Sequence, residues 1–258
     1  MDVVGDILAR DRRSRDIALV TPDGRERTYR DVITNAYKAA NVLRYLGARE
    51  GSTVAVEPTP GLHPLLGFLG AAGLGAPVRF DPAAGVERGD RVVLVDVDHE
   101  STTKPAPGTG LAVFGGPPER PETTHWEQEL WSENPGMPPS AVGPDDPVLR
   151  GPGGDEPGDG GPEDDGPNGG GDVSHRALLD AAASVVDEEG SDPDDGVVLR
   201  GDLADPRALT AGVVAPLAAG ATAVLAGDQP TDDEPTVTVD GADAEESRTV
   251  TLPVIGDH

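Results

Sequence analysis

The amino-acid sequence predicts an α/β fold with a mainly parallel β-sheet. Short apolar runs of strand length alternate along the chain with longer apolar runs whose side chains recur every three to four residues, the period of a helix. Glycine and proline separate many of these runs. Strands that alternate with helices at this spacing are typical of parallel pairing, because each crossover helix carries the chain back to the edge where the next strand begins.

The first elements expected are a short helix over residues 2–13 and a β-hairpin. The hairpin strands are Ala18–Thr21 and Glu26–Tyr29, on either side of a Pro-Asp-Gly turn. Thr28 and Asp31 then form the capping-box pattern that begins a helix. The apolar face of that helix consists of Val32, Ile33, Ala36, Ala40, Leu43 and Leu46.

The rest of the chain continues the alternation of strands and helices. The elements expected before residue 150 are the strand Thr53–Val56, the helix Leu62–Leu74, the strands Arg91–Val95 and Leu111–Phe114, and a short helix over Trp126–Trp131. The elements expected after residue 172 are a helix capped by Ser174, the strand Val197–Leu199, the helix Leu209–Ala218 and the strand Thr222–Leu225.

Residues 151–172 differ in kind from the segments around them. Ten glycines, four prolines, seven acidic residues and one asparagine fill all 22 positions. Such a segment cannot bury apolar surface, so we expect a disordered loop within a domain of residues 1–228. Residues 229–258 are expected to form an acidic C-terminal tail with two short strands, at Thr236–Val239 and Thr249–Val254.

The charge of the chain excludes several classes of partner and site. Its 47 acidic and 20 basic residues give a formal net charge of −27, and only two of the basic residues are lysines. Nucleic acids and anionic membranes require clustered positive charge on a protein, so the sequence predicts neither as a partner. Because the chain has no cysteine, it cannot form disulfides, thiolate metal sites or a cysteine nucleophile.

The same composition predicts a protein adapted to a high-salt cytosol. Self-repulsion at this net charge strains a folded state at ordinary ionic strength, and it nearly vanishes in molar salt, where the Debye length is about 3 Å. An acidic interaction protein of a low-salt cell is the alternative. The N-terminus lacks the pattern of a signal peptide, and the uncharged run Leu209–Gly227 is interrupted by Pro216, so we expect buried elements there and a cytoplasmic location.

Seven segments follow one another in an informative order. They are Ala18–Gly24; Thr28–Val32; Gly47–Val56, similar to a GVxxGDxVAV turn and strand; Gly75–Pro82, similar to AGAxxVPLDP; Pro144–Leu149; Ser174–Leu179; and Leu209–Leu225. In this order they resemble the N-terminal part of the adenylate-forming (AMP-binding) acyl-CoA synthetase superfamily. The resemblance implies a three-layer sandwich like the first subdomain of those enzymes. It also implies a reaction in which ATP, with Mg²⁺, and a carboxylate form an acyl-adenylate before the acyl group passes to CoA.

The segment that corresponds to the phosphate loop of that family lacks the chemistry of the loop. The family sequence Tyr/Phe-Thr-Ser-Gly-Thr-Thr-Gly-x-Pro-Lys-Gly presents hydroxyls, backbone amides and a lysine to the triphosphate. Residues 151–172 contain no serine, threonine or lysine, and Pro167, Asn168 and Gly169 are a remnant of Pro-Lys-Gly with asparagine in place of lysine. The acids that would repel phosphate are Asp155, Glu156, Asp159, Glu163, Asp164 and Asp165.

Two further differences from the family also indicate that the chain does not catalyse the family reaction. Counting back from Leu209 places Asp205 where the family often has the histidine of a Pro-Leu-Phe-His segment beside the acyl site. The sequence also ends at His258, before the family's adenine-binding motif, ribose-binding aspartate and C-terminal domain with its lysine. We therefore expect no catalytic residue and no bound ATP, Mg²⁺ or CoA cofactor.

Other residues carry weaker signals. Adjacent Ser174 and His175 cannot form a nucleophile–base pair at a helix start, so we expect a helix cap and a surface residue of the first turn. The stretch Asp96-Val-Asp98-His99-Glu100 has metal-binding residue types, but an acidic loop at a strand end explains it without a metal. Structural roles are expected for His63, Trp126 and Trp131.

The leading prediction is a non-catalytic, acyl-CoA-synthetase-like protein. It would bind an acyl-, adenylate- or CoA-like ligand, or modulate a full-length relative. One alternative is a component of an AMP-forming acid–thiol ligase that acts with a separate C-terminal-domain chain. The other is a structural module that binds a partner protein.

Overall fold

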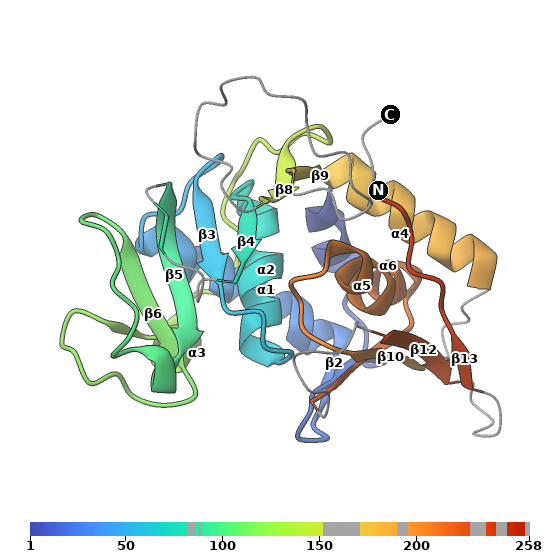
Figure 1. The fold of residues 1–258 in the computed structure, drawn as a ribbon, viewed down its shortest axis with the longest axis horizontal. Coiled ribbons are helices and arrows are strands. Elements are labelled where there is room, and N and C mark those ends of the chain that lie inside the picture. The colour runs from blue at the N-terminus through green and yellow to red at the C-terminus, as the bar shows by residue number, and fades with distance from the viewer. Residues whose placement is uncertain are drawn as a thin grey trace.

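The computed structural model of the chain describes residues 1–81, 86–87, 89–151, 171–189, 196–227, 236–240 and 247–255. These residues form two mixed β-sheets, whose strand pairs taken together are mainly parallel, with helices packed against them (Figure 1). The α/β class and the mainly parallel pairing are confirmed. The chain builds two sheets, whereas the sequence predicted one.

The seven-stranded sheet consists of strands from the middle of the chain: β3 (Thr53–Val56), β4 (Val78–Phe80), β5 (Asp90–Asp96), β6 (Gly110–Phe114), β7 (Thr124–His125), β8 (Pro147–Leu149) and β9 (Val173–Ser174). Their order is β7-β6-β5-β3-β4-β8-β9, and all neighbours are parallel except β8 and β9. The central strands are runs of valine, leucine and alanine that are buried on both faces, which is usual in parallel sheets.

The six-stranded sheet consists of strands from the two ends of the chain: β1 (Ile17–Val20), β2 (Glu26–Thr28), β10 (Gly196–Arg200), β11 (Thr222–Ala226), β12 (Thr236–Asp240) and β13 (Ser247–Thr249). Their order is β13-β12-β10-β11-β1-β2, and β11 is parallel to both of its neighbours. Strands β12 and β13 follow residue 228, so this sheet continues into the segment expected to be a tail. The strand expected over Thr249–Val254 instead occupies Ser247–Thr249.

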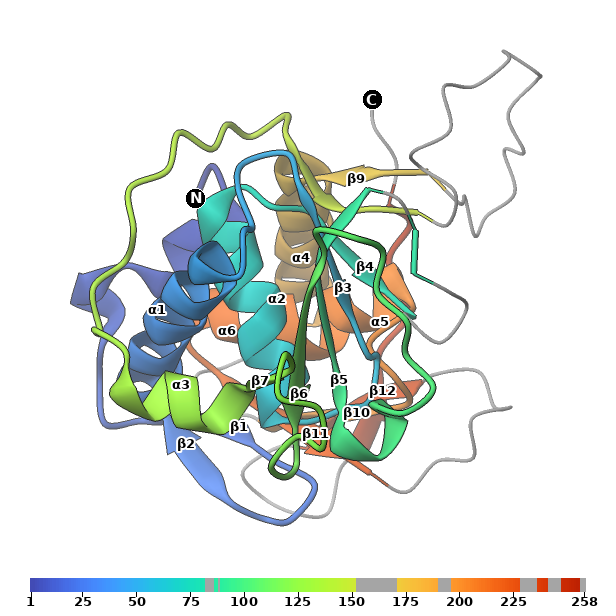
Figure 2. The same ribbon diagram turned by 90° about the vertical axis from the view of Figure 1, so that its left-hand side faces the viewer.

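Helices α1 (Tyr29–Tyr45) and α2 (Leu62–Leu74) pack against each other between the two sheets (Figures 1 and 2). The predicted capping box begins α1, because the Thr28 hydroxyl accepts the Asp31 N–H and the Asp31 carboxylate accepts the Thr28 N–H. Helix α2 is apolar on all sides because α1 and the seven-stranded sheet cover it together. At Gly70 a Cβ atom would lie 2.8 Å from the backbone nitrogen of Ala40, so glycine permits this close approach.

A second group of helices covers the six-stranded sheet: α6 (Ala215–Ala219) contacts β11 directly, α4 (His175–Glu189) packs on α6, and α5 (Pro206–Leu209) precedes α6 in the chain. A π-helical turn, Thr210–Val214, joins α5 to α6, so the helix expected over Leu209–Ala218 contains a change of helical type. No helix within the described ranges is long and apolar enough to cross a membrane.

Two of the shorter helices differ from expectation. Residues 2–13 contain two 3₁₀ helices, η1 (Val4–Leu8) and η2 (Arg10–Arg12), instead of one longer helix. Helix α3 (Trp126–Ser132) is present and buries Trp126 fully, but Trp131 is 87% exposed and is not a packing anchor. Five residues span about 1.4 turns of a helix, so the two tryptophans face in different directions.

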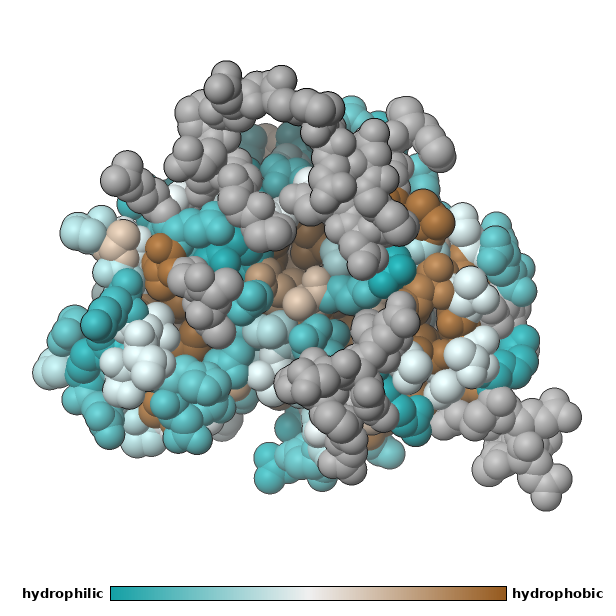
Figure 3. Space-filling model, viewed as in Figure 1, coloured by the Kyte–Doolittle hydropathy of each residue, from teal (hydrophilic) through white to brown (hydrophobic). Residues whose placement is uncertain are grey.

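Apolar side chains form one large core around α1 and α2, which lie on one side of the seven-stranded sheet (Figure 2). A smaller core lies on the other face of that sheet and consists of Ala55, Val93, Val95, Leu111 and Val113. On the face shown in Figure 3, hydrophilic residues predominate among the described residues and hydrophobic residues emerge in patches. This surface agrees with the acidic composition of the chain.

Candidate functional site at the carboxyl ends of β3 and β5

The order of the seven-stranded sheet reverses between β3 and β5. From β3 the chain passes through α2 to β4 on one side, and from β5 it passes to β6 on the other side. Where connections from two neighbouring parallel strands diverge in this way, a crevice opens at the carboxyl ends of the strands. The residues that follow β3 and β5 are therefore the first candidates for a binding site.

Glu57 and His99 meet at this point. Glu57 directly follows β3, and its Oε2 atom accepts the Asp96 N–H at 2.8 Å and lies 3.0 Å from His99 Nδ1. The Thr59 hydroxyl donates to the other carboxylate oxygen at 2.9 Å. The side chain of Glu57 is 10% exposed, whereas that of His99 is 60% exposed. A nearly buried carboxylate thus orients an imidazole that is open to solvent.

The carboxylate also changes the acidity of the imidazole. The hydrogen bond to Glu57 and the charge of Glu57 raise the pKa of His99, and burial opposes them only weakly. A histidine with a raised pKa and one nitrogen engaged can offer its other N–H to an anionic group of a ligand. Glu57 is not among the residues expected from the sequence, although an acidic residue directly after a buried parallel strand is a usable signal.

Replacing Glu57 with glutamine is expected to lower the pKa of His99, because a neutral amide no longer favours the imidazolium. Glutamine keeps an oxygen that can accept the Asp96 N–H. An NMR titration of the His99 ring protons against pH measures the change. Asp98→Asn is the matched control, since Asp98 raises the same pKa less than Glu57 does. A larger decrease in the Asp98 variant would show that Glu57 is not the dominant partner.

The loop that follows β10 reaches the same edge of the sheet. The N–H of Leu203, which is fully buried, donates to the Pro58 carbonyl at 2.8 Å. Two residues later, Asp205 begins α5: its carboxylate accepts the Arg207 N–H at 2.8 Å and binds the Arg207 guanidinium at 2.7 Å. Burial alone would raise the pKa of Asp205, but the hydrogen bonds from Arg207 outweigh it and lower that pKa. The carboxylate is therefore ionised and engaged, and a poor proton acceptor.

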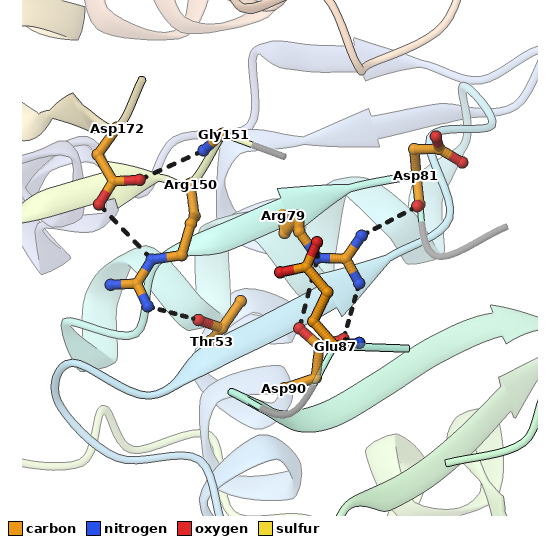
Figure 4. Close-up of polar contacts among 8 residues, drawn as sticks. All are labelled: Thr53, Arg79, Asp81, Glu87, Asp90, Arg150, Gly151 and Asp172. Carbon is orange, nitrogen blue, oxygen red and sulfur yellow. Dashed lines mark hydrogen bonds and ion pairs between the residues drawn. The ribbon is translucent and has the colours of Figure 1, made fainter. Parts of the chain in front are cut away.

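The segment predicted to replace the phosphate loop leaves and rejoins the described part of the fold at the carboxyl end of β8 (Figure 4). Arg150 joins the two ends, because its Nε atom lies 3.6 Å from the Asp172 carboxylate. Its Nη1 atom donates to the Thr53 hydroxyl at 3.0 Å, which attaches the same side chain to β3. The same carboxylate accepts the Gly151 N–H at 3.3 Å. The expected remnant of the phosphate loop lies outside the described residues: Pro167, Asn168 and Gly169.

Ser174 and His175 occupy the join between β9 and α4. Ser174 Oγ accepts the Ala177 N–H at 3.2 Å, as expected of a helix cap. The expectation that His175 is a surface residue is wrong, because the side chain is fully buried and its Nδ1 atom accepts the Val4 N–H at 3.1 Å. Burial lowers the pKa of His175 to about 4, so the ring is neutral at physiological pH. The contact joins segments 171 residues apart, which no local pattern could reveal.

A buried ion pair lies on the face of the seven-stranded sheet that points away from α1 and α2 (Figure 4). Arg79 Nη2 donates to Asp90 Oδ2 at 2.7 Å, Arg79 Nη1 donates to the Asp81 carbonyl at 3.1 Å, and the Glu87 carboxylate lies 3.8 Å from Arg79 Nε. The Arg79 side chain is 4% exposed and that of Asp90 is completely buried. This pair joins β4 to the start of β5 and is structural.

The remaining candidates separate into different parts of the fold. Asp96 Oδ1 accepts the Asp98 N–H, whereas Glu100 is buried and accepts the N–H groups of Glu119 and Arg120. Within the described part of the chain, no group of three or more histidine, aspartate or glutamate side chains is placed to hold a metal ion. His63 stacks on Phe114, with the ring centroids 5.8 Å apart, in a structural role.

Comparisons with solved structures place this architecture among known proteins. The anthranilate CoA ligase AuaEII, solved with anthranoyl-AMP, matches 88% of the chain at a TM-score of 0.68 and 20% identity, over 45% of its own length. MatB from Rhodopseudomonas palustris matches 87% at a TM-score of 0.66 and 17% identity, over 44% of its length. The N-terminal domain of FACL13 from Mycobacterium tuberculosis matches 90% at a TM-score of 0.68 and 22% identity, over 58% of its length.

Neither a family model nor a curated protein sequence matches the chain. The chain spans less than half the length of the first two of these proteins, and the identities are low, so the likeness concerns the fold. Each match extends over 87–90% of the chain, in agreement with the order of motifs in the sequence. The chain therefore has the fold of the N-terminal domain of adenylate-forming acyl-CoA ligases.

Proposed function

We propose that this chain is a non-catalytic relative of the adenylate-forming acyl-CoA ligases that binds an acyl-, adenylate- or CoA-like ligand. The observation that carries the proposal is the composition of the segment between β8 and β9. By its resemblance to those ligases, this is the position of the phosphate loop, and residues 151–172 hold seven acids and no serine, threonine or lysine. Carboxylates repel a triphosphate, and neither a side-chain hydroxyl nor an ammonium group is left to bind it.

The state of Asp205 supports the same proposal. It stands where the resemblance places a histidine beside the acyl site, and its carboxylate is already engaged by Arg207 and by the start of α5. An ionised carboxylate with a lowered pKa accepts protons weakly, so it does not replace a histidine in acid–base chemistry. Loss of the phosphate-binding groups and of this imidazole leaves a scaffold suited to binding.

The proposed ligand site is the crevice at the carboxyl ends of β3 and β5. Glu57 orients His99 there, and the raised pKa of His99 favours the charged ring, which can donate to a carboxylate or phosphate. The hydrogen bond from Leu203 to Pro58 holds the loop after β10 beside the residues that follow β3. If the chain modulates a full-length relative, the form that does so would be the chain with its ligand bound at this site.

Thermal unfolding in molar KCl tests this proposal with AMP, CoA and a non-hydrolysable acyl-adenylate as probes. A ligand at a hundred times its Kd stabilises the native state by about 2.7 kcal/mol, which raises the Tm of a chain of this size by roughly 5–10 °C. His99→Gln should reduce that increase. Arg30→Gln, which removes the charge of an exposed side chain in the first turn of α1, should leave it unchanged.

ATP–pyrophosphate exchange is measured with the same preparations and a panel of carboxylates. We expect no exchange above the rate without protein. Exchange with any carboxylate would overturn the non-catalytic assignment. If none of the three probes raises the Tm, the ligand-binding part of the proposal is wrong.

A further inference from the structure

A hollow of about 550 Å³ lies at the C-terminal end of α1, lined by Asn41, Arg44, Tyr45, Arg49 and Glu133. Its volume falls within the range of small-molecule sites. Arg49 precedes β3, so the hollow is at the amino end of that strand, opposite the carboxyl ends where Glu57 and His99 lie. It is a second site, separate from the crevice described above.

The residues that line this hollow include two arginines and a single acidic residue, in a chain that is strongly acidic as a whole. The chain has a net charge of −27, only two lysines and eight Phe, Trp and Tyr residues. Of the aromatic side chains that are largely exposed in the described ranges, Tyr45 (81% exposed) lines this hollow, and Trp131 (87% exposed) stands two residues before Glu133, which also lines it. Lys38, one of the two lysines, donates to the Trp131 carbonyl at 3.4 Å. Lys38, Asn41 and Tyr45 fall on one face of α1.

The two arginines of the hollow form no ion pair with a described carboxylate. Arg49 Nη1 donates to the carbonyls of Arg44 and Ala48 at 2.7 and 2.6 Å, which fixes its guanidinium at the end of α1. Arg44 has one long contact, 3.4 Å from its Nη2 atom to Asn41 Oδ1. Most of the donors of both groups therefore remain available, and the planar guanidinium matches the oxygens of a phosphate.

Hydrogen bonds to the segment after α3 fix one wall of the hollow. The side-chain amide of Asn41 donates to the carbonyls of Asn134 and Gly136 at 3.2 and 2.7 Å. The Glu133 carboxylate accepts the Asn134 N–H at 3.1 Å, which holds this side chain in place. A wall fixed before binding reduces the entropy that a ligand must overcome.

We propose that this hollow binds a small ligand that carries both a phosphate and a planar ring, in the manner of a nucleoside monophosphate. The phosphate binds Arg44 and Arg49, the ring stacks on Tyr45, and Glu133 accepts hydrogen bonds from ring or sugar donors. The net charge of −27 disfavours a polymer with the same groups, because a nucleic acid requires many cationic contacts. This assignment does not depend on the function proposed for the crevice at His99.

Guanosine 5′-monophosphate is the probe, and the measurement is isothermal titration in 0.2 M KCl, after thermal unfolding has shown that the chain is folded at this salt concentration. Tyr45→Ala and Arg44→Gln should each weaken binding by about tenfold or more, because one removes the stacking surface and the other a phosphate contact. Arg30→Gln removes the same charge from the other end of α1 and should change the affinity less than twofold. His99→Gln should also leave it unchanged, which separates this site from the crevice. Tyr45 is exposed, so its variant should keep the Tm of the parent.

Guanosine and inorganic phosphate should each bind at least about tenfold more weakly than the nucleotide, since each lacks half of the proposed contacts. Equal binding of phosphate alone would overturn the stacking role of Tyr45. The assignment as a whole fails if the nucleotide does not bind, or if Arg30→Gln weakens it as much as Arg44→Gln.

Discussion

Replacing Arg79 with methionine is expected to lower the free energy of unfolding by about 3–5 kcal/mol. Asp90 would then keep a completely buried carboxylate without the guanidinium that lies 2.7 Å from it. Methionine fills much of the volume of the arginine stem, so the loss comes from the uncompensated charge more than from a cavity. Denaturant unfolding at neutral pH in molar KCl measures the change, and molar salt does not screen a pair that is removed from solvent.

Two variants separate this effect from a general loss of charge. Arg25→Met removes an arginine whose ion pair with Asp23 is exposed, and the free energy of unfolding should remain nearly the same. The double variant Arg79→Met with Asp90→Leu removes both charges and should recover a large part of the loss. If Arg79→Met is no less stable than Arg25→Met, the buried pair does not have the role assigned to it.

Acid should destabilise the protein through His175 at a pH where most carboxylates are still ionised. The pKa of this buried ring is about 4 in the native state, against about 6.5 in an unfolded chain. Between these values the unfolded chain binds one proton more than the native state, so the free energy of unfolding falls as pH decreases from 6.5 towards 4. The full loss from this one group is about 3 kcal/mol.

His175→Asn is the matched variant for this prediction. Asparagine does not titrate, and its side-chain oxygen can accept the Val4 N–H in place of Nδ1. The difference between the parent and this variant, measured by unfolding at pH 7.5, 6.0 and 5.0, isolates the imidazole. Above pH 4.5 buried Glu100 does not contribute to the pH dependence of the free energy of unfolding, because its hydrogen bonds lower its pKa to about 2 despite its burial. A pH dependence that is the same in both proteins would contradict the role of His175.

Local patterns predict the elements whose signals lie in adjacent residues. The strand Thr53–Val56 and the helix Leu62–Leu74 have the predicted bounds, because each is an uninterrupted apolar run next to turn-forming residues. The capping box at Thr28 is a contact over three residues, and it forms as the sequence predicts. The strand near Thr236 also forms, but its pairing with β10 depends on a contact over some forty positions and is not visible locally.

The candidate site is less predictable from the sequence, because most of its contacts join residues that are far apart along the chain. Ser174 caps its helix through a neighbour three positions away, and this role follows from the sequence. The contacts of Glu57 with His99 and of His175 with Val4 join residues 42 and 171 positions apart. Trp131 has the hydrophobicity of a core residue, yet the direction in which α3 presents it places it outside. Composition reveals which groups are available, and only the packing decides which of them meet.

The position of β1 has a consequence for the order in which the chain folds during synthesis. This strand lies between β2 and β11, and its residue Ile17 meets Thr222, 205 positions later. The seven-stranded sheet needs no residue beyond Ser174, so a ribosome-bound chain can complete it while β1 still lacks a partner on one side. Closing the six-stranded sheet must therefore be a late step, and pairing over so long a separation is intrinsically slow.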